Sequence, residues 1–295
     1  MLQGYNVCSP LLTGLFSPSF SRTNRIMYLE VTKNEAGADI QPVPILFVHG
    51  MWHAAWCWSE YFLPFFARQG YSSYALSLRG HGGSEGRKHL RWASLDDYVS
   101  DLVRVVGQFE KPPILIGHSM GGMVVQKYLE SRPAAAAVLL ASVPPAGVLA
   151  STARMFLRHP VLVTRAGLTL DMAVIIKTPE LMREAFFSLD IPEKVLLKYH
   201  SLMQAESFRV YLDMLVFNLP KPRPLSLPLL VLGAQDDRMV STGEVEVTAR
   251  SYGVQAEIFS GMAHDMMLES GWKKVAERIL DWLGRQNLSP GIWKP

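Results

Sequence analysis

Cysteine is scarce in this sequence of 295 residues, which contains only Cys8 and Cys57. Neither belongs to a C-x-x-C pair, so we expect no disulfide framework and no zinc or thiol-redox site of that type. The eight histidines show no H-E-x-x-H spacing. We therefore expect a protein whose chemistry needs neither a metal ion nor an organic cofactor.

Long apolar runs are also missing. The nearest candidate, residues 134–150, is interrupted by Pro144 and Pro145 and falls short of the roughly 18 residues that a membrane span needs. The N-terminus has no Lys or Arg before Arg22, and Pro10 breaks its short apolar run, which makes it a poor signal peptide. We expect a cytoplasmic protein without a transmembrane segment, in which residues 1–25 form a loose N-terminal extension.

An excess of charge of one sign is absent as well. Lys and Arg number 29 against 26 Asp and Glu, which gives a net charge of +3. The basic residues form no stripe, so we expect no nucleic-acid partner. Apolar residues make up 49% and charged residues 19%, an ordinary composition for a globular protein. We expect a monomer or a homodimer.

Short apolar runs alternate with amphipathic segments along much of the chain. Strands are predicted over 43–50, 71–80, 112–117, 135–142, 227–237 and 255–261. Helices are predicted over 58–70 and 94–109, from 119 and 241 onward, and over 272–286. Such alternation predicts an α/β fold with a mostly parallel central sheet that is flanked by helices.

The alternation stops near Pro144 and resumes near Leu227. The chain between them is rich in Met, Leu and Phe, and helices are predicted over 179–191, 192–204 and 207–219. We interpret residues 146–226 as a helical cap, or lid, inserted in a single core. That core is formed by residues 26–145 and 227–295.

Ser119 lies where the apolar run 112–117 gives way to a helical pattern, in the sequence GHSMGG. A side chain at such a turn projects above the end of the sheet, and small residues at Gly117 and Gly121 avoid clashes there. The helix N-terminus favours a developing oxyanion. A serine in G-x-S-x-G between a strand and a helix is typical of a nucleophile, although the same serine could serve only as an N-cap.

A serine nucleophile needs a base, and the base needs an orienting carboxylate. Among the histidines, His264 alone follows a late predicted strand, so we predict it as the base. Asp236 and Asp237 both follow the strand before it. The spacing to Met239 and Val240 favours Asp237 as the acid, and Asp236 is the alternative.

Two backbone N–H groups are candidates for an oxyanion hole. Gly50 allows the chain to turn after the first strand, so that the N–H of Met51 can face the nucleophile. The other donor would be the N–H of Met120, which directly follows Ser119.

Five motifs in this order resemble the α/β-hydrolase superfamily, in its esterase and lysophospholipase-like branch. They are HGMWHAAW, SLRGHGGSEG, GHSMGGMV, LGAQDDRMV and GMAHDMMLE, and they fall within residues 40–285. The resemblance implies the α/β-hydrolase fold, with Ser119 as nucleophile, His264 as base and acid, and Asp237 as its orienting partner. It implies a serine hydrolase that cleaves a carboxylic ester through an acyl-enzyme.

Other activities stay open on the same motifs. The stretch 49–58 is similar to plant hydroxynitrile lyases, although these have Thr where this chain has Gly50. A receptor-like binding protein on the same scaffold is a further alternative. A thioesterase or a lactonase would share the acyl-transfer chemistry.

The predicted cap bears on the substrate. An apolar wall with few polar anchors suits a small lipophilic molecule, and no cluster of Arg or Lys stands out to hold a phosphate. We expect an uncharged lipophilic ester of short to medium acyl chain. The expected substrate-binding residues are Trp52, His53, Phe186, Met214 and Phe217.

Overall fold

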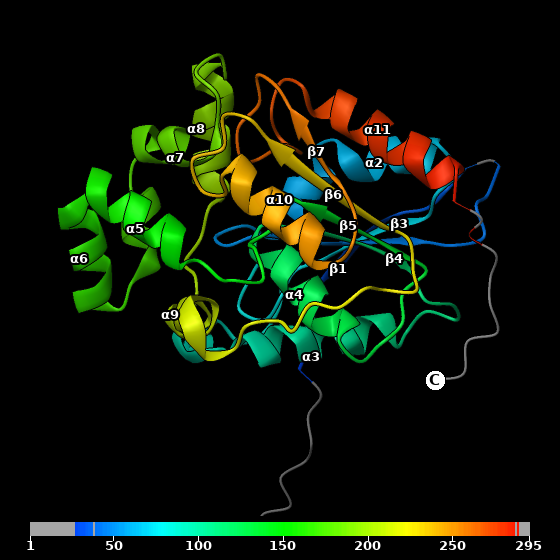
Figure 1. Cartoon of the computed structure of the whole chain (residues 1–295), viewed down its shortest axis with the longest axis horizontal. Coiled ribbons are helices and arrows are strands. Elements are labelled where there is room, and N and C mark those ends of the chain that lie inside the picture. Colours follow the sequence, from blue (N-terminus) through cyan, green and yellow to red (C-terminus); the bar gives the residue numbers. More distant parts are fainter. Residues whose placement is uncertain (1–26, 38, 287, 289–295) are drawn as a thin grey trace, which may run out of the picture.

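Seven strands form a single sheet in the computed structural model, which describes residues 27–37, 39–286 and 288 (Figure 1). The strands are β1 (Val31–Asn34), β2 (Ile45–Val48), β3 (Ser73–Leu76), β4 (Ile114–His118), β5 (Ala136–Leu140), β6 (Leu229–Ala234) and β7 (Ala256–Phe259). Their order in the sheet is β1-β3-β2-β4-β5-β6-β7. All neighbouring pairs are parallel except β1 and β3. This confirms the predicted, mostly parallel sheet.

Helices cover both faces of the sheet, because successive side chains of each strand point to opposite faces. On β2, Ile45 and Phe47 face one hydrophobic core, and Leu46 and Val48 face the other. The first core is closed by α1 (Trp56–Ser59), α2 (Phe62–Arg68) and α11 (Trp272–Gly284). The second is closed by α3 (Leu95–Val106), α4 (Met120–Leu129) and α10 (Thr242–Ser251). Both faces of the central strands are therefore dry, which explains their unbroken apolar runs.

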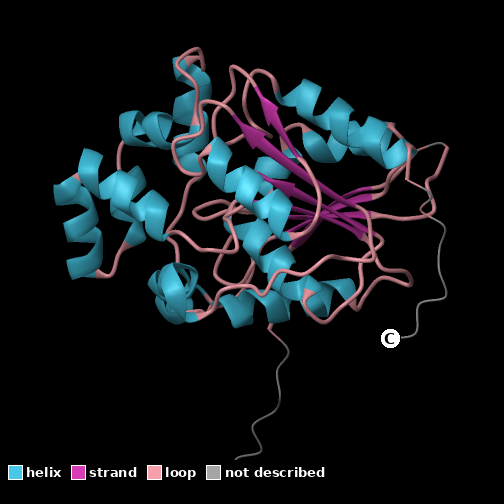
Figure 2. Ribbon diagram, viewed as in Figure 1, coloured by secondary structure: helices cyan, strands magenta, loops and turns pink. Residues whose placement is uncertain are grey.

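Between β5 and β6 the chain is helical, and we call residues 146–226 the insertion. Its helices are α5 (Leu149–Arg158), α6 (Pro160–Thr169), α7 (Pro179–Phe186), α8 (Glu193–Leu202) and α9 (Phe208–Leu212). A 3₁₀ turn, η2 (Met172–Ile176), and a π-helical turn, η3 (Asp213–Phe217), lie among them. The strand arrows point toward the side of the molecule on which these helices lie (Figure 2). The insertion is thus placed at the carboxyl ends of the strands.

Some elements differ from those expected from the sequence. The edge strand β1 was not predicted, because it is short and only half-buried and lacks an apolar run. The predicted helix 58–70 is instead two helices, α1 and α2. Between β3 and α3 the chain forms a 3₁₀ helix, η1 (Arg87–Trp92). The expected N-terminal extension, including Cys8, falls outside the described residues.

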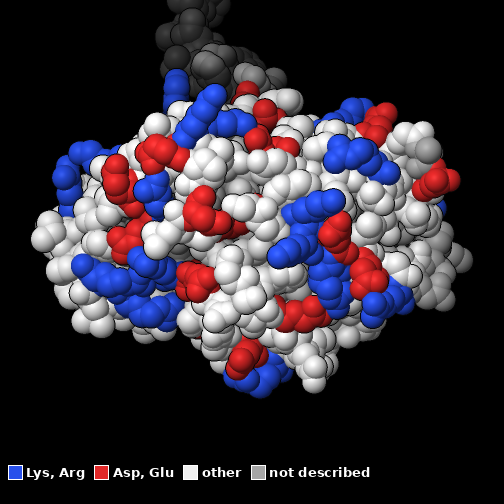
Figure 3. Space-filling view, turned by 90° about the horizontal axis from the view of Figure 1, so that it is seen from above, with Lys and Arg blue, Asp and Glu red and all other residues white. Residues whose placement is uncertain are grey.

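The surface shows charges of both signs. On the face drawn in Figure 3, Lys and Arg side chains are interspersed with Asp and Glu, and neither sign covers the face. Cys57 is buried and forms no disulfide with another described residue. No helix among residues 27–37, 39–286 and 288 is long and apolar enough to cross a membrane.

Candidate active site

Ser119 occupies the turn between β4 and α4. Since β4 ends at His118 and α4 begins at Met120, the strand turns into a helix at this one residue. Its backbone has φ 51° and ψ −119°, which non-glycine residues adopt only under strain. Surrounding packing holds this conformation and directs the side chain to the carboxyl edge of the sheet. A nucleophile at a strand-to-helix turn requires this geometry.

Three glycines surround Ser119 because backbones approach very closely here. A Cβ atom on Gly117 would overlap the backbone of Gly121, and one on Gly121 would overlap the carbonyl of Val48. A Cβ on Gly122 would overlap the side chain of Ser142. The glycines therefore let α4 begin directly against β2 and against the loop after β5.

His264 and Asp237 form a buried pair in the loops after β7 and β6. The Nδ1 atom of His264 lies 2.7 Å from Oδ2 of Asp237. The other oxygen of Asp237 accepts the backbone N–H groups of Met239 and Val240, at 2.7 and 2.8 Å. Asp236 is exposed to solvent. Of the two candidate acids, the geometry joins Asp237 to the histidine.

The carboxylate changes the proton affinity of the imidazole. Burial lowers the pKa of His264, but the adjacent Asp237 carboxylate outweighs this effect, and the pKa lies above its ordinary value of 6.5. Because a carboxylate accepts a hydrogen bond, the proton of neutral His264 belongs on Nδ1. Nε2 is then left as an acceptor, which is the tautomer that a general base next to Ser119 needs.

Other histidines near the turn have different partners. His118 Nε2 lies 3.0 Å from the carbonyl oxygen of His264, and burial lowers the pKa of His118 to about 3. His53 Nε2 lies 3.0 Å from Oδ2 of the buried Asp265. His49 Nδ1 and Nε2 both contact backbone groups. These rings brace the loops around Ser119.

Both residues that carry the predicted oxyanion donors lie next to Ser119. Met120 is the first residue of α4, so its N–H has no acceptor within the helix. The loop carrying Met51 passes close to Ser119, since a Cβ atom on Gly50 would lie 3.0 Å from Ser119 Cβ. The next residue, Trp52, has φ 65°. This positive φ turns the loop over the end of the sheet.

Ser119 and His264 line a common cavity of about 40 Å³. A second, apolar cavity of about 230 Å³ lies between the core and the insertion. Both cavities are lined by Met51, Trp52, Val148, Ser151 and Met239, so the two spaces adjoin. The nucleophile candidate therefore lies next to a lipophilic space.

Four of the five predicted substrate-binding residues line these cavities. Trp52 borders both, His53 and Phe186 border the smaller one, and Met214 borders the larger one. Phe217 does not: its side chain is 71% exposed and lines neither cavity. The reason is the π-helical turn η3, which directs Met214 into the protein and Phe217 outward. The expectation for Phe217 is corrected accordingly.

Part of the larger cavity was missed from the sequence. Its wall includes Met155 on α5, Val163 and Ala166 on α6, and Met172 on η2. The signal was present in the apolar periodicity of residues 149–158, which predicts an amphipathic helix.

One group of possible metal ligands lies beside the site. Atoms of His118, His264 and Asp265 lie within 4.8 Å of one another. However, His118 Nε2 contacts the His264 carbonyl, and one Asp265 oxygen contacts His53. Because the contacts among these side chains account for their closeness, we assign no metal to them.

Comparison with known proteins identifies the family. The model of the alpha/beta hydrolase family matches residues 45–278. This chain belongs to that family. The expected superfamily and fold are thereby confirmed. An esterase from Exiguobacterium antarcticum has the same fold with a TM-score of 0.69, at 18% identity over 88% of this chain and 96% of that chain.

Curated relatives share parts of the sequence. A monoacylglycerol lipase from Mycolicibacterium smegmatis is 28% identical over 233 residues, which are 74% of this chain and 80% of the relative. A pyrethroid hydrolase from Sphingobium wenxiniae is 24% identical over 256 residues, or 81% of this chain and 86% of the relative. Their names are those of a lipase and a hydrolase, which supports the expected class of carboxylic ester hydrolase.

Proposed function

We propose that this protein hydrolyses carboxylic esters through an acyl-enzyme formed on Ser119. One observation carries the proposal: His264, hydrogen-bonded to Asp237 at 2.7 Å, lines the same cavity as Ser119. A buried carboxylate that orients a histidine next to a serine is the arrangement that activates a hydroxyl for attack. The lipase and hydrolase relatives support ester hydrolysis as the reaction.

The chemistry follows from the positions of these groups. His264 Nε2 takes the proton of Ser119 while Oγ attacks the ester carbonyl carbon. The carbonyl oxygen becomes an oxyanion, which the N–H groups of Met51 and Met120 stabilise. The imidazolium then gives its proton to the alcohol oxygen as the C–O bond breaks, which leaves an acyl group on Ser119. Water repeats the two steps, and the acid and the free serine result.

The substrate class is proposed from the larger cavity. All of its lining residues are uncharged, and most are Met, Val, Ala, Ile or aromatic. Its volume of about 230 Å³ is below the ~300–1,000 Å³ typical of sites for drug-sized ligands. We therefore propose an uncharged, lipophilic ester with a short to medium acyl chain. In this proposal the insertion serves as the cap that sets chain-length preference.

The test combines turnover with labelling of the nucleophile. Wild-type protein is assayed with p-nitrophenyl esters of graded chain length and, separately, labelled with a fluorophosphonate that is located by peptide mass spectrometry. The proposal expects multiple turnovers, a maximum at short to medium chains, and the label on Ser119. A single slow turnover would instead support a receptor-like protein. Labelling of a different serine would exclude the proposed nucleophile.

A further inference from the structure

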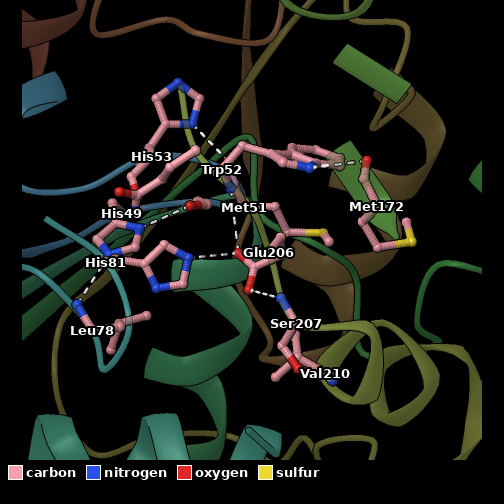
Figure 4. Close-up of polar contacts among 12 residues, drawn as sticks. His49, Met51, Trp52, His53, Leu78, His81, Met172, Glu206, Ser207 and Val210 are labelled. Atoms are coloured by element: carbon pink, nitrogen blue, oxygen red, sulfur yellow. Dashed lines mark hydrogen bonds and ion pairs between the residues drawn. The ribbon is translucent and has the colours of Figure 1, made fainter. Parts of the chain in front are cut away.

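The loop that carries the proposed oxyanion donor Met51 is held by the insertion. The N–H of Trp52 donates to Glu206 Oε2 at 3.3 Å, and the carbonyl of Trp52 accepts the N–H of Gln204 at 3.1 Å. Its indole Nε1 donates to the carbonyl of Met172 at 3.2 Å. Figure 4 shows Trp52 between Glu206 on one side and Met172 on the other. All three partners belong to the insertion.

Glu206 is a buried carboxylate with every acceptor position used. Oε2 faces Trp52 N–H and, at 3.2 Å, His81 Nε2 (Figure 4). Oε1 accepts the hydroxyl of Tyr98 at 2.7 Å and the N–H of Ser207 at 2.6 Å. An ionised carboxylate can accept about four such bonds and donates none. The site therefore suits an anion held by four donors.

The charge state agrees with this arrangement. Burial raises the pKa of Glu206, but His81 and the donors outweigh burial, and the pKa lies below its ordinary value. His81 Nδ1 lies 3.1 Å from the carbonyl oxygen of Arg79. Both ring nitrogens of His81 thus have polar partners, and the ring is held between Arg79 and Glu206.

We propose that Glu206 is a positioning residue for the oxyanion hole: through Trp52 N–H it fixes the Met51–Trp52 peptide so that Met51 N–H faces the oxyanion at Ser119. This inference rests on the proposed function. Trp52 has φ 65°, which a non-glycine residue leaves readily unless its surroundings hold it. The N–H of Met51 has no hydrogen-bond partner of its own among the described residues. This N–H belongs to the Gly50–Met51 peptide, and only the backbone torsions of Met51 separate it from the next peptide, which Glu206 holds at Trp52 N–H and His53 contacts at the Met51 carbonyl.

The test variant is Glu206→Gln, which keeps the shape but replaces one acceptor oxygen with a donor. The backbone N–H groups of Trp52 and Ser207 lie on different oxygens of Glu206, so the new NH₂ must face one of them. Removing an oxyanion donor outright costs about 10²–10³ in kcat, so a displaced donor should lower kcat by about 10- to 100-fold. KM should stay within about twofold, since ground-state binding does not use this donor.

A tetrahedral inhibitor and a matched variant separate positioning from general damage. The affinity for a trifluoromethyl ketone, which forms an oxyanion on the serine, should fall by the same factor as kcat/KM. Tyr98→Phe removes a donor to the other oxygen of Glu206 and leaves Trp52 in place, so its kcat should stay within about twofold. Melting temperatures show that each variant is folded. If Glu206→Gln does not fold, Glu206→Asp, whose shorter side chain cannot keep all four contacts, replaces it.

A second measurement does not depend on turnover. The backbone amide of Trp52, observed by NMR in protein labelled with [¹⁵N]tryptophan and assigned by its loss in Trp52→Phe, should exchange faster with solvent in Glu206→Gln.

Equal loss of kcat in Glu206→Gln and Tyr98→Phe would overturn the inference, and so would unchanged affinity for the ketone. If the wild-type protein turns over no ester, the proposed function fails. Unchanged exchange at Trp52 would then overturn the positioning claim, and faster exchange would uphold it.

Discussion

Buried histidine–carboxylate pairs near the carboxyl edge of the sheet include His53 with Asp265, His264 with Asp237 and His81 with Glu206. The last two have different surroundings. His264 Nδ1 lies 2.7 Å from Asp237, and His81 Nε2 lies 3.2 Å from Glu206. The side chains of both pairs are at most 3% exposed, so burial does not distinguish them. The second nitrogen of His264 has no protein partner among the described residues, and its ring lines a cavity with Ser119.

The free nitrogen is what separates the two pairs. His81 uses both of its nitrogens, and Glu206 uses both of its oxygens. A fully satisfied pair holds segments together, whereas a pair with one open position next to a cavity can exchange a proton with a ligand. Burial and charge alone would mark both pairs as functional candidates. The count of satisfied atoms supports His264, and not His81, as the proposed base.

The largest expected effect comes from removing the hydroxyl of Ser119, the proposed partner of His264 Nε2. Ser119→Ala should lower kcat for ester hydrolysis by about five to six orders of magnitude, because the nucleophile is lost while the fold stays. Steady-state kinetics with a p-nitrophenyl ester measure this, and circular dichroism checks the fold. If a folded variant kept a tenth of wild-type activity, Ser119 would not be the nucleophile. The proposed catalytic role of His264 and Asp237 would then fail as well.

The next effect tests the carboxylate of that pair. Asp237→Asn should lower kcat by about 10⁴-fold, because an amide no longer selects the productive tautomer of His264. Asp236→Asn is the matched control: Asp236 is exposed, and we expect a change in unfolding free energy within about 0.5 kcal/mol and near-normal kcat. A reversed ranking of the two variants would make Asp236 the triad acid.

The pH dependence of the rate provides a smaller and sharper test. The base must be neutral to act, so kcat/KM should fall as the pH drops through the pKa of His264. Since Asp237 raises that pKa, half-maximal kcat/KM should occur above pH 6.5 in the wild-type enzyme. In Asp237→Asn, burial and the smaller effect of Asp265 remain while the raising effect of Asp237 is lost, so the midpoint should move to lower pH. A midpoint that does not move would mean that another group controls the profile.

The smallest expected effect concerns the walls of the larger cavity, which adjoins the cavity that Ser119 and His264 line. Met155→Ala enlarges the larger cavity at a half-buried position, so the preferred acyl chain should lengthen, with a change of about threefold to tenfold in the ratio of kcat/KM between long and short esters. Phe217→Ala, on the exposed side of η3, should leave this ratio unchanged. Equal shifts in both variants would argue against the cavity as the acyl site.

Local sequence was enough to predict most of the fold and to select the central residues of the proposed site. Ser119 could be found because its glycines and its flanking strand and helix are contiguous in the chain. His264 and Asp237 follow strands whose carboxyl ends meet at one edge of a parallel sheet. Their pairing needed only the order of the strands.

Features that depend on distant contacts were not predictable. Trp52 and Glu206 are 154 residues apart, and nothing in either segment indicates the other. Phe217 was misplaced because the expectation rested on the apolar composition of the insertion, which does not show which side chains face inward. Phe217 ends the π-helical turn η3, and its side chain is exposed. The strand β1 escaped because it is only half-buried at the edge of the sheet.

The contact between Gln204–Glu206 and Trp52 has a consequence for protein engineering. Caps of hydrolases are attractive units to exchange when a new specificity is wanted, with the junctions placed near residues 146 and 226. In this chain such an exchange would also remove the acceptor that holds the loop after β2. The core would receive a new binding surface, and Trp52 would lose its hydrogen bonds to Glu206, Gln204 and Met172. A chimera should therefore retain Gln204 and Glu206, or supply an equivalent carboxylate, before its specificity is judged.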